Sequence, residues 1–599
     1  MVNKTLRKTV YAIAATAFGS TFLVGCVDNS YDLSKDMDLN ATIGGQELNL
    51  PVSSTAALTM KDILDLNEDD SSIKEAKEGE YGLHAGDYVL VQGPDGEPTK
   101  TDVEIALVDI DESGLSGSES ESVIEFPLVD MGAVEMPTKP ITTLLNIKDD
   151  NVDPQLLSIS EATTEVVLNV KVTFSSEDYH GIASIKTGTK AKFSDRWFLS
   201  ITDPETMSYA RIEDDHTVLF TQDKEFHGGQ DEGFTLVINV VKFELGSNKG
   251  EGLYAPGHFD MESEVEFEGH MEIQNEETRP GEFAIIRLNT ATSVESAVLR
   301  TVTGTVNPTI DVDPTSVEIN DIPDFLSDKD NNLDILNPQI RIDVTNASPV
   351  EAFISAKIVA TYPADSEKQP MEITIGDEYK KAPITINGDG LTKLCLTQTG
   401  DVESGYTPVV VPELSSLLKT IPEKLEVSDI NVKANTTKEV NITLGDKYHF
   451  ETAYEAVVPF QFGPDMVIHY NTTEDNWDTD LDSYNFGSVV LSMDVVNTTP
   501  LGMTPEIIAL DKDGKEINDV TCTFTPKDNA IKANSTSSIS AELKSNGNNL
   551  GKMAGVQINF TAKTGAEGKG KTLNANQSLK LNNIKVSIKG GITVDLNEL

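Results

Sequence analysis

Apolar and polar residues alternate along most of the chain from about residue 160 onward. In the segment 166–174, nearly every second side chain is apolar and most of its neighbours are polar. This period of two is typical of a β-strand that buries one face. Segments rich in Asn, Asp and Gly, such as 387–390, 511–514 and 545–548, separate these runs and favour tight turns. The pattern therefore predicts antiparallel sheets over most of the chain.

Helical spacing is rare in this sequence. Its best example begins at Leu414, which is followed by apolar residues three, four and seven positions later, at Leu417, Leu418 and Ile421. Pro412 lies just before this run, and a proline suits the start of a helix. We therefore expect one short helix here, crossing between two sheets.

The chain resembles itself when it is shifted by 151 residues. Segment 343–349 then falls on segment 494–500, and Asp, Val, Asn and Pro recur at four of the seven positions. The apolar phase also agrees, since Ile340 meets Leu491. Both segments contain Asn-x-Ser/Thr-Pro, which suits a strand that enters a turn, because Asn caps the turn and Pro ends the ladder. The shift therefore predicts a duplicated domain.

A third and weaker copy is expected to begin near residue 134. In this copy the apolar positions of segment 168–172 take the places of those in segment 340–344, although the Asn and the Pro are missing. The predicted fold class is all-β, with tandem antiparallel β-sandwich domains of the immunoglobulin-like or Greek-key type. We expect the three sandwiches at the following ranges: 134–303, 304–454 and 455–599.

The first 26 residues follow a different pattern. Three basic residues precede an apolar run at 10–24, which is too short and too rich in small residues for a stable membrane span. Gly25 and Cys26 follow the run. This order resembles a bacterial lipobox. The resemblance implies that residues 1–25 are a signal peptide that is removed, and that Cys26 becomes the acylated first residue of the mature chain. An ordinary signal peptide with a chance cysteine is the alternative.

Residues 26–133 differ in kind from the predicted sandwiches. The chain is polar and acidic as far as about residue 50, and residues 58–66 could form one short helix. Residues 111–121 are rich in Ser, Gly and Glu, which indicates a loop. We therefore expect this range to hold the lipidated cysteine, an acidic tether and a small strand-rich module.

The lipobox at residues 23–26, followed by a polar tether and by sandwiches rich in Thr, Asn and Asp, resembles the outer-membrane lipoproteins of Bacteroidota. That group also includes surface glycan-binding proteins and fimbrial subunits. The resemblance implies an outer-membrane lipoprotein held by an N-terminal palmitate-type chain, with exposure at the cell surface left open.

The chain is strongly acidic, with a formal net charge of −52. Removal of the signal peptide takes away three basic residues and leaves 43 basic and 98 acidic ones, a net charge of −55. Such a field repels nucleic-acid backbones and anionic lipid surfaces. We therefore expect no nucleic-acid partner, and a membrane contact through the lipid alone.

Two cysteines, Cys395 and Cys522, remain in the mature chain after Cys26. Two cysteines do not make a disulfide framework, and both lie in strand-like contexts. None of the eight histidines is close to either in sequence, as a catalytic thiol would require. We expect both to be buried free thiols.

Asp328, Asp330, Asn332 and Asp334 place oxygen atoms at positions 1, 3, 5 and 7 of one loop. This spacing can wrap a hard cation such as calcium. A standard EF-hand is excluded, because Leu333 stands where that loop requires glycine. Calcium is therefore the one candidate cofactor, and a solvated, turn-forming loop is the alternative.

Trp477 lies in the polar and acidic segment 474–482, with no apolar neighbours to bury it. An exposed aromatic face can stack on a sugar ring. One hypothesis is therefore a ligand platform for glycans at Trp477. The alternative is an anchor that folds the loop back on the sandwich.

Two further patterns have plainer interpretations. Segment 262–272 alternates five carboxylates and one imidazole with apolar or small residues, which predicts a solvent-facing strand surface more than a metal site. Segment 565–572 matches the phosphate-loop pattern letter for letter, but a strand pattern and not a helix pattern follows it. We therefore interpret this segment as a hairpin tip.

The sequence contains no G-x-S-x-G, no H-E-x-x-H and no paired cysteine and histidine. We therefore expect no enzymatic activity. The expected function is that of a lipid-anchored cell-envelope protein acting as a non-catalytic binding or scaffolding array, with an unknown protein or glycan partner. A fimbrial or adhesive subunit and a surface glycan-binding protein are the alternatives.

Overall fold

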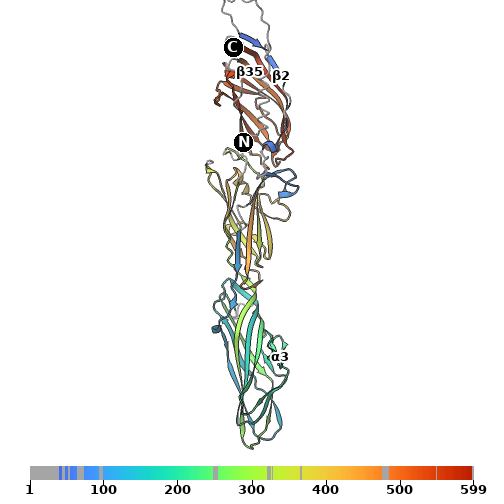
Figure 1. Cartoon of the computed structure of the whole chain (residues 1–599), viewed down its shortest axis with the longest axis vertical. Helices are drawn as coiled ribbons and strands as arrows, with labels where there is room; N and C mark the ends of the chain where they lie inside the picture. The colour runs from blue at the N-terminus through green and yellow to red at the C-terminus, as the bar shows by residue number, and fades with distance from the viewer. Residues whose placement is uncertain are drawn as a thin grey trace, which may run out of the picture.

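The computed structural model arranges the chain in three β-sandwiches, and nearly all of their strand pairs are antiparallel. The predicted all-β fold class is confirmed. Figure 1 shows the sandwiches stacked end to end along the long axis, the first at one end and the third at the other. The structure describes residues 40–595 except 44–46, 52–53, 55, 64–72, 94–98, 247–253, 320–325, 327, 329, 365–366, 475–483 and 548.

The first sandwich is the largest. One sheet has the order β15 (Trp197–Ser200), β19 (Glu232–Glu244), β12 (Leu156–Glu177), β23 (Phe283–Val306) and β32 (Val440–Thr443), and β7 (Val108–Asp109) and β9 (Glu119–Pro127) also pair with β23. The facing layer contains β16 (Ala210–Asp214), β17 (Thr217–Phe220), β14 (Lys190–Lys192), β21 (His258–Glu268), β11 (Ile141–Asp149) and β8 (Leu115–Gly117), with β20 (Tyr254–Ala255) beside β21. It is completed by β10 (Ala133–Pro137), β22 (His270–Asn275), β13 (Gly181–Ile185) and β18 (Lys224–His227), and by the short helices α3 (Pro204–Met207) and η2 (Glu112–Gly114).

The second sandwich lies in the middle of the rod. One sheet has the order β30 (Thr407–Val410), β29 (Gly390–Thr397), β25 (Gln339–Asn346), β33 (Lys447–Pro459), β5 (Tyr88–Gln92) and β4 (Ile73–Glu75), with β6 (Thr99–Glu104) also beside β33. The facing sheet contains β24 (Thr315–Glu318), β31 (Lys424–Ala434), β26 (Ala352–Thr361), β27 (Met371–Ile375) and β28 (Ile384–Ile386). Among the 3₁₀ helices of the described residues that connect these strands are η1 (Glu80–Gly82), η5 (Asp377–Tyr379) and η6 (Leu414–Leu418).

The third sandwich closes the other end. One sheet has the order β1 (Asn40–Ile43), β40 (Ser578–Asp595), β35 (Tyr484–Asn497), β38 (Ser535–Ser545) and β37 (Val520–Thr525), with β2 (Glu47–Pro51) and β3 (Leu58–Thr59) also on β40. The facing sheet contains β34 (Val467–Glu474), β39 (Gly555–Lys563) and β36 (Gly502–Leu510). The helices here are α2 (Met60–Ile63), α4 (Gly565–Gly568) and η7 (Asn549–Lys552).

One topology recurs in the three sandwiches. In each sandwich a central strand lies between two neighbours that occupy equivalent places in the strand order. These are β12 between β19 and β23, β25 between β29 and β33, and β35 between β38 and β40. The facing sheet β24–β31–β26 of the second sandwich corresponds to β34–β39–β36 of the third, and to the split layer β10–β22–β13 and β11–β21–β14 of the first. We call β23, β33 and β40 the final strands, because each ends the run of strands that is common to the sandwiches.

The two motifs that the 151-residue shift aligns make the same hydrogen bonds. The side-chain amide donates to the backbone carbonyl four residues later, at 2.8 Å from Asn346 and 2.7 Å from Asn497. Its carbonyl oxygen accepts from the hydroxyl two residues later, Ser348 or Thr499, at 2.8 Å in both cases. All four side chains are buried. The two motifs therefore have the same local structure, and the duplication stays a prediction.

The period of two places alternate side chains of the strands in the core, as predicted. Leu168, Val170 and Val172 of β12 are fully buried. The predicted short helix is confirmed at Leu414, but it is a 3₁₀ helix that ends at Leu418. Pro422 follows Ile421, and a residue before proline is kept out of the α region, so Ile421 cannot extend the helix.

Segment 565–572 does not form the expected hairpin tip. Its backbone lies against the link that follows the second sandwich, where Gly570 N donates to Phe462 O at 3.0 Å and Gln461 Nε2 donates to Gly570 O at 2.9 Å. The short helix α4 precedes the Lys571-Thr572 pair instead of following it. The segment is therefore part of the junction between the second and third sandwiches.

Candidate functional site

The strands of residues 40–127 pair with all three sandwiches, in reverse order. β1, β2 and β3 lie on β40 of the third sandwich, β5 and β6 lie on β33 of the second, and β7 and β9 lie on β23 of the first. In Figure 1 the blue β2 accordingly lies beside the red strands of the third sandwich. The range for which the sequence predicts a tether and a small module thus contributes strands to each sandwich. We call residues 40–127 the strap.

The strap stays nearly in register with each final strand. Asn40 lies opposite Asp595 and Thr59 opposite Ser578, so the strap advances 19 positions while β40 goes back 17. On the second sandwich it advances 15 positions, from Val89 to Glu104, while β33 goes back 12. On the first it advances 19 positions, from Val108 to Pro127, while β23 goes back 16. The strap therefore follows each final strand with little slack.

Between β7 and β9 the strap makes an excursion to the facing sheet, where β8 pairs with β11. Gly117 makes this crossing possible. A Cβ atom at this position would come within 1.8 Å of the carbonyl oxygen of Thr292, so only glycine fits. The hydroxyl of Thr292 then accepts from Ser118 N at 3.1 Å. The strap thus ties the two sheets of the first sandwich together at their edge.

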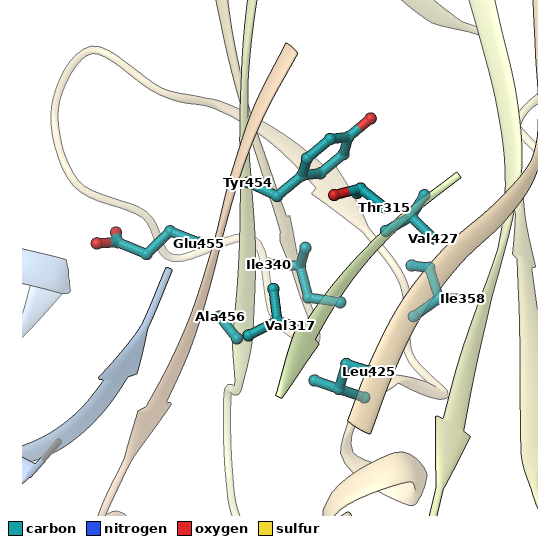
Figure 2. A pocket seen from close by; sticks show the side chains of 9 residues that line it. All are labelled: Thr315, Val317, Ile340, Ile358, Leu425, Val427, Tyr454, Glu455 and Ala456. Atoms are coloured by element: carbon teal, nitrogen blue, oxygen red, sulfur yellow. The ribbon is translucent and has the colours of Figure 1, made fainter. Parts of the chain in front are cut away.

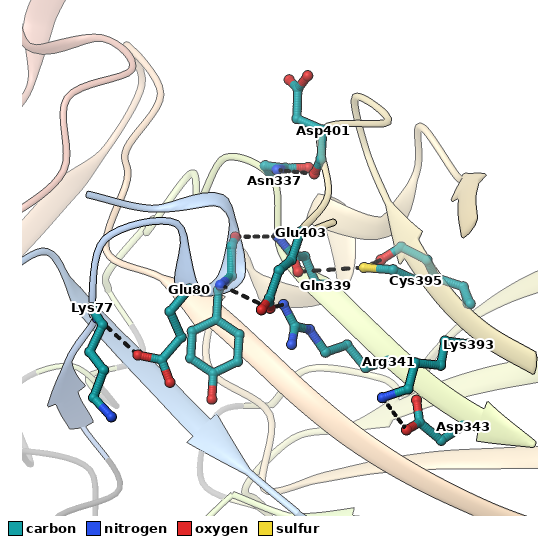
Figure 3. Close-up of polar contacts among 12 residues, drawn as sticks. Lys77, Glu80, Asn337, Gln339, Arg341, Asp343, Lys393, Cys395, Asp401 and Glu403 are labelled. Atoms are coloured by element: carbon teal, nitrogen blue, oxygen red, sulfur yellow. Dashed lines mark hydrogen bonds and ion pairs between the residues drawn. The ribbon is translucent and has the colours of Figure 1, made fainter. Parts of the chain in front are cut away.

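On the second sandwich the strap is held by a cluster around Arg341, which we call the latch. The guanidinium carbon of Arg341 lies 4.3 Å from the ring centre of Tyr81 in the strap and 4.6 Å from that of Tyr406. Arg341 also donates to the carboxylate of Glu403 at 2.8 Å, and Tyr81 N donates to the same oxygen at 3.3 Å. Gln339 Nε2 donates to the carbonyl of Tyr81 at 3.0 Å. Figure 3 shows this network between the strap loop and the sheet.

Burial makes the latch more than a surface ion pair. The Arg341 side chain is only 7% exposed, and Glu403 is 35% exposed. Tyr81 is also buried and has a positive φ of 57°, which an aromatic residue adopts only when its surroundings hold it there. The strap side chains Ala76 and Leu83 pack with Val457 on the same outer face. The loop 76–87 therefore covers what would otherwise be the solvent face of β25 and β33.

Burial raises the pKa values of two titratable groups near the latch. Glu455 is paired with Arg341 across the sheet. Burial raises the pKa of Glu455, and the nearby Arg341 charge opposes that rise. Burial also raises the pKa of the Cys395 thiol to about 11, so this cysteine is a thiol at neutral pH. Its Sγ lies 3.4 Å from Gln339 Oε1. The cysteine therefore packs beneath the latch and offers no nucleophile.

The structure confirms that Cys395 and Cys522 are free. Cys395 is buried as predicted, whereas Cys522 is half-buried. Burial raises the pKa of Cys522 to about 11 as well. Neither thiol is poised for nucleophilic chemistry.

A small cavity lies between the sheets of the second sandwich. It encloses about 10 Å³ and is lined by Ile340, Ile358 and Tyr454, among other mostly apolar residues, as Figure 2 shows. This volume holds about one water molecule, whereas ligand pockets usually enclose about 300 Å³ or more. The cavity is therefore a gap in the packing and not a binding site.

Two of the four predicted calcium ligands hold the junction between the second and third sandwiches. Asn332 Nδ2 donates to the carbonyl of Asp465 at 2.8 Å, and Asp334 Oδ2 accepts from Asp465 N at 2.9 Å. Asp328 accepts from the backbone of Asp330 at 2.9 Å, which closes a turn. Within the residues that the structure describes, no three His, Cys, Asp or Glu side chains are grouped so as to hold a metal ion. The calcium site stays a prediction.

The other predicted site residues, Cys26 and Trp477, lie outside the described residues. The carboxylate ladder of 262–272 faces solvent, as predicted. Lys192 lies on the neighbouring strand, and its Nζ is 2.5 Å from a carboxylate oxygen of Glu268. This ion pair lowers the pKa of the Glu268 carboxyl. The ladder is therefore neutralised in part by cross-strand lysines.

None of the helices in the described part of the chain is long and apolar enough to span a membrane. No protein-family model matches the chain, and a search of curated proteins gives no match. The sequence pattern and the strap are therefore the main guides to function.

Several solved structures are similar to parts of the chain, and three of them are described here. A protein of Parabacteroides distasonis ATCC 8503, provisionally described as secreted, is 16% identical, with 49% of this chain and 83% of that chain covered and a TM-score of 0.36. A structure of Sulfolobus turreted icosahedral virus is 10% identical over 88% of this chain and 98% of that one, with a TM-score of 0.10. The VP2 subviral particle of infectious bursal disease virus is 9% identical over 82% and 84%, with a TM-score of 0.12. Such low TM-scores support no argument about fold or function.

Proposed function

We propose that this chain is a lipid-anchored protein of the bacterial cell envelope, in which three sandwiches form a non-catalytic binding or scaffolding array that stands on its third sandwich. The observation that carries the orientation is the pairing of β1. Asn40 lies opposite Asp595, at the end of β40 that points away from the second sandwich. The other end of β40 follows Leu573, which is hydrogen-bonded to Phe460 at the junction.

The position of Cys26 limits how far the lipid can lie from this end. Cys26 precedes Asn40 by 14 positions. An extended chain spans at most about 3.5 Å per residue, so the lipid would lie within about 50 Å of β1. The third sandwich would then be nearest the membrane and the first sandwich outermost. An outer-membrane location and a palmitate-type lipid are part of this proposal.

The array itself is supported by the recurring topology and by the matching Asn346 and Asn497 networks. Sandwiches that have one strand order and share a strap form a rod, and a rod can hold a binding surface away from its anchor. A non-catalytic role rests on the sequence, which lacks the catalytic motifs sought. In the fimbrial alternative a sandwich exchanges a strand with another chain, whereas here each final strand is paired with the strap of its own chain.

The anchor is tested with Cys26→Ala. We expect the wild-type chain to incorporate labelled palmitate and to sediment with membranes, and the variant to do neither. A chain that begins at Val27 should be soluble and folded. Retention of that chain on membranes after a salt wash would overturn the anchor, because a chain with a net charge of −55 has no electrostatic reason to bind an anionic surface.

The orientation needs a separate experiment in vesicles that carry the lipidated chain. A fluorophore is attached at Thr278→Cys, in the loop between β22 and β23, or at Asp513→Cys, in the loop after β36, with Cys522 replaced by serine in both. A quencher on the lipid head groups should dim position 513 and leave position 278 bright. Equal quenching would mean that the rod lies flat or is anchored elsewhere.

A further inference from the structure

The chain runs the length of the rod twice. It enters at Asn40 on the third sandwich, follows the strap past the second, and reaches Pro127 opposite Phe283 on the first. Phe283 begins β23 at the far tip, because the other end of β23 pairs with β32 beside the second sandwich. The chain then returns through the first, second and third sandwiches. The strap is therefore a covalent path from one end of the rod to the other.

We propose that the strap is a load-bearing element, which carries tension between the N-terminal end and the tip of the first sandwich by shear against the three final strands. A pull along the rod acts parallel to β40, β33 and β23. All ladder hydrogen bonds beside a final strand then share the load, whereas a pull across the strands would break them one after another. This proposal needs only a pull on the N-terminal end and does not depend on how that end is anchored.

Two features keep the strap from sliding. The latch stacks Tyr81 against the buried Arg341 and hydrogen-bonds the strap backbone to Glu403 and Gln339. A slip by one residue would also turn every side chain of a strand to the opposite face. The small register offsets leave little chain to be drawn out within each sandwich.

The direction of pulling gives the test, because one molecule offers both geometries. Single-molecule force spectroscopy is performed on the chain that begins at Val27. One set of handles joins its N-terminus and Thr278→Cys at the tip, which loads the strap in shear. The other set joins the N-terminus and the C-terminus. Asn40 and Asp595 are neighbours, so this second pull peels β1 from β40.

We expect the shear geometry to rupture at a clearly higher force than the peeling geometry. Equal forces, or a lower force in the shear geometry, would overturn the proposal. The cysteine pair Asn49→Cys and Ser587→Cys is the control, because these two residues are paired across β2 and β40 and their side chains are hydrogen-bonded. The oxidised pair should let β1 peel at an unchanged force and then stop the peeling at residue 49, whereas the reduced pair should peel further. Release of chain beyond residue 49 in the oxidised form would mean that this pull does not peel the β1–β40 ladder and would overturn the comparison of the two geometries.

The latch is tested in the same apparatus with Arg341→Met, after its melting curve shows a folded chain. We expect a lower shear force and an unchanged first peeling event, because peeling begins on β40, far from the latch. An unchanged shear force would contradict the role of the latch in fixing the strap. The test uses no lipid, so its failure is distinct from a failure of the proposed anchor.

Discussion

The guanidinium carbon of Arg341 lies 4.3 Å from the ring centre of Tyr81, so a sheet residue and a strap residue stack on each other. This contact joins two parts of the chain that are far apart in sequence. It lies on a face that the sequence pattern assigns to solvent. The same contact gives the first prediction.

Arg341→Met should lower the free energy of unfolding by about 2–3 kcal/mol, because a largely buried charge pair and two ring contacts are lost. Denaturant unfolding measures the change. Arg300→Met is the matched control, since Arg300 forms an exposed ion pair with Glu165 at 2.7 Å. The control should change stability by about 0.5 kcal/mol or less. Similar losses in the two variants would argue against the latch.

The paired Asn networks predict equal effects in two sandwiches. Asn346→Ala and Asn497→Ala should each cost about 1–3 kcal/mol, because buried backbone carbonyls and a hydroxyl lose their partners. Hydrogen exchange should show the loss of protection in the second sandwich for Asn346→Ala and in the third for Asn497→Ala. Asn441→Ala, at an exposed position, serves as the control. A cost at one Asn and none at the other would refute the equivalence of the motifs.

The raised pKa of Glu455 predicts that the stability of the chain depends on pH. Its pKa is raised in the folded chain, chiefly by burial, so the folded state binds the proton more tightly than the unfolded state. Its charged form therefore opposes folding at neutral pH. This penalty disappears as pH falls from above the raised pKa to below the ordinary value of 4.5. Glu455→Gln should stabilise the chain at pH 7 and give no gain near pH 3.

Melting curves of the wild-type chain and of Glu455→Gln across this pH range provide the measurement. Glu451→Gln is a suitable control, because Glu451 lies on the same strand and pairs with Lys100 at 3.5 Å near the surface. A stabilisation of Glu455→Gln that is the same at both pH values would point to packing and not to charge.

The loop of Asp328, Asp330, Asn332 and Asp334 has a structural role at the junction and is also the predicted calcium site. Two different substitutions distinguish these roles. Asp334→Ala should destabilise the chain by about 1–2 kcal/mol without any metal, because Asp465 N loses its acceptor. If calcium binds, millimolar calcium should raise the melting temperature of the wild-type chain, and Asp330→Ala should abolish that rise. Identical melts with calcium and with a chelator would leave only the structural role.

Local patterns predicted the strands well because the period of two reports which face of a strand is buried, as at Leu168 and Val170. The pattern also located the Asn motifs, since the hydrogen bonds of Asn346 reach mainly to residues a few positions away. It was less successful at residues 40–127. Their short apolar runs predict a strand-rich region, but the partners of those strands are hundreds of residues away.

The sequence by itself determined the fold class, the turns and the buried positions of the long strands, because each depends on neighbours within a few residues. Only the tertiary structure decided where the strap lies and why Arg341 is buried. Gln339, Arg341 and Asp343 alternate with apolar residues in β25 and so resemble a solvent face. The strap loop covers that face, and burial there depends on a segment whose distance along the chain leaves no local pattern.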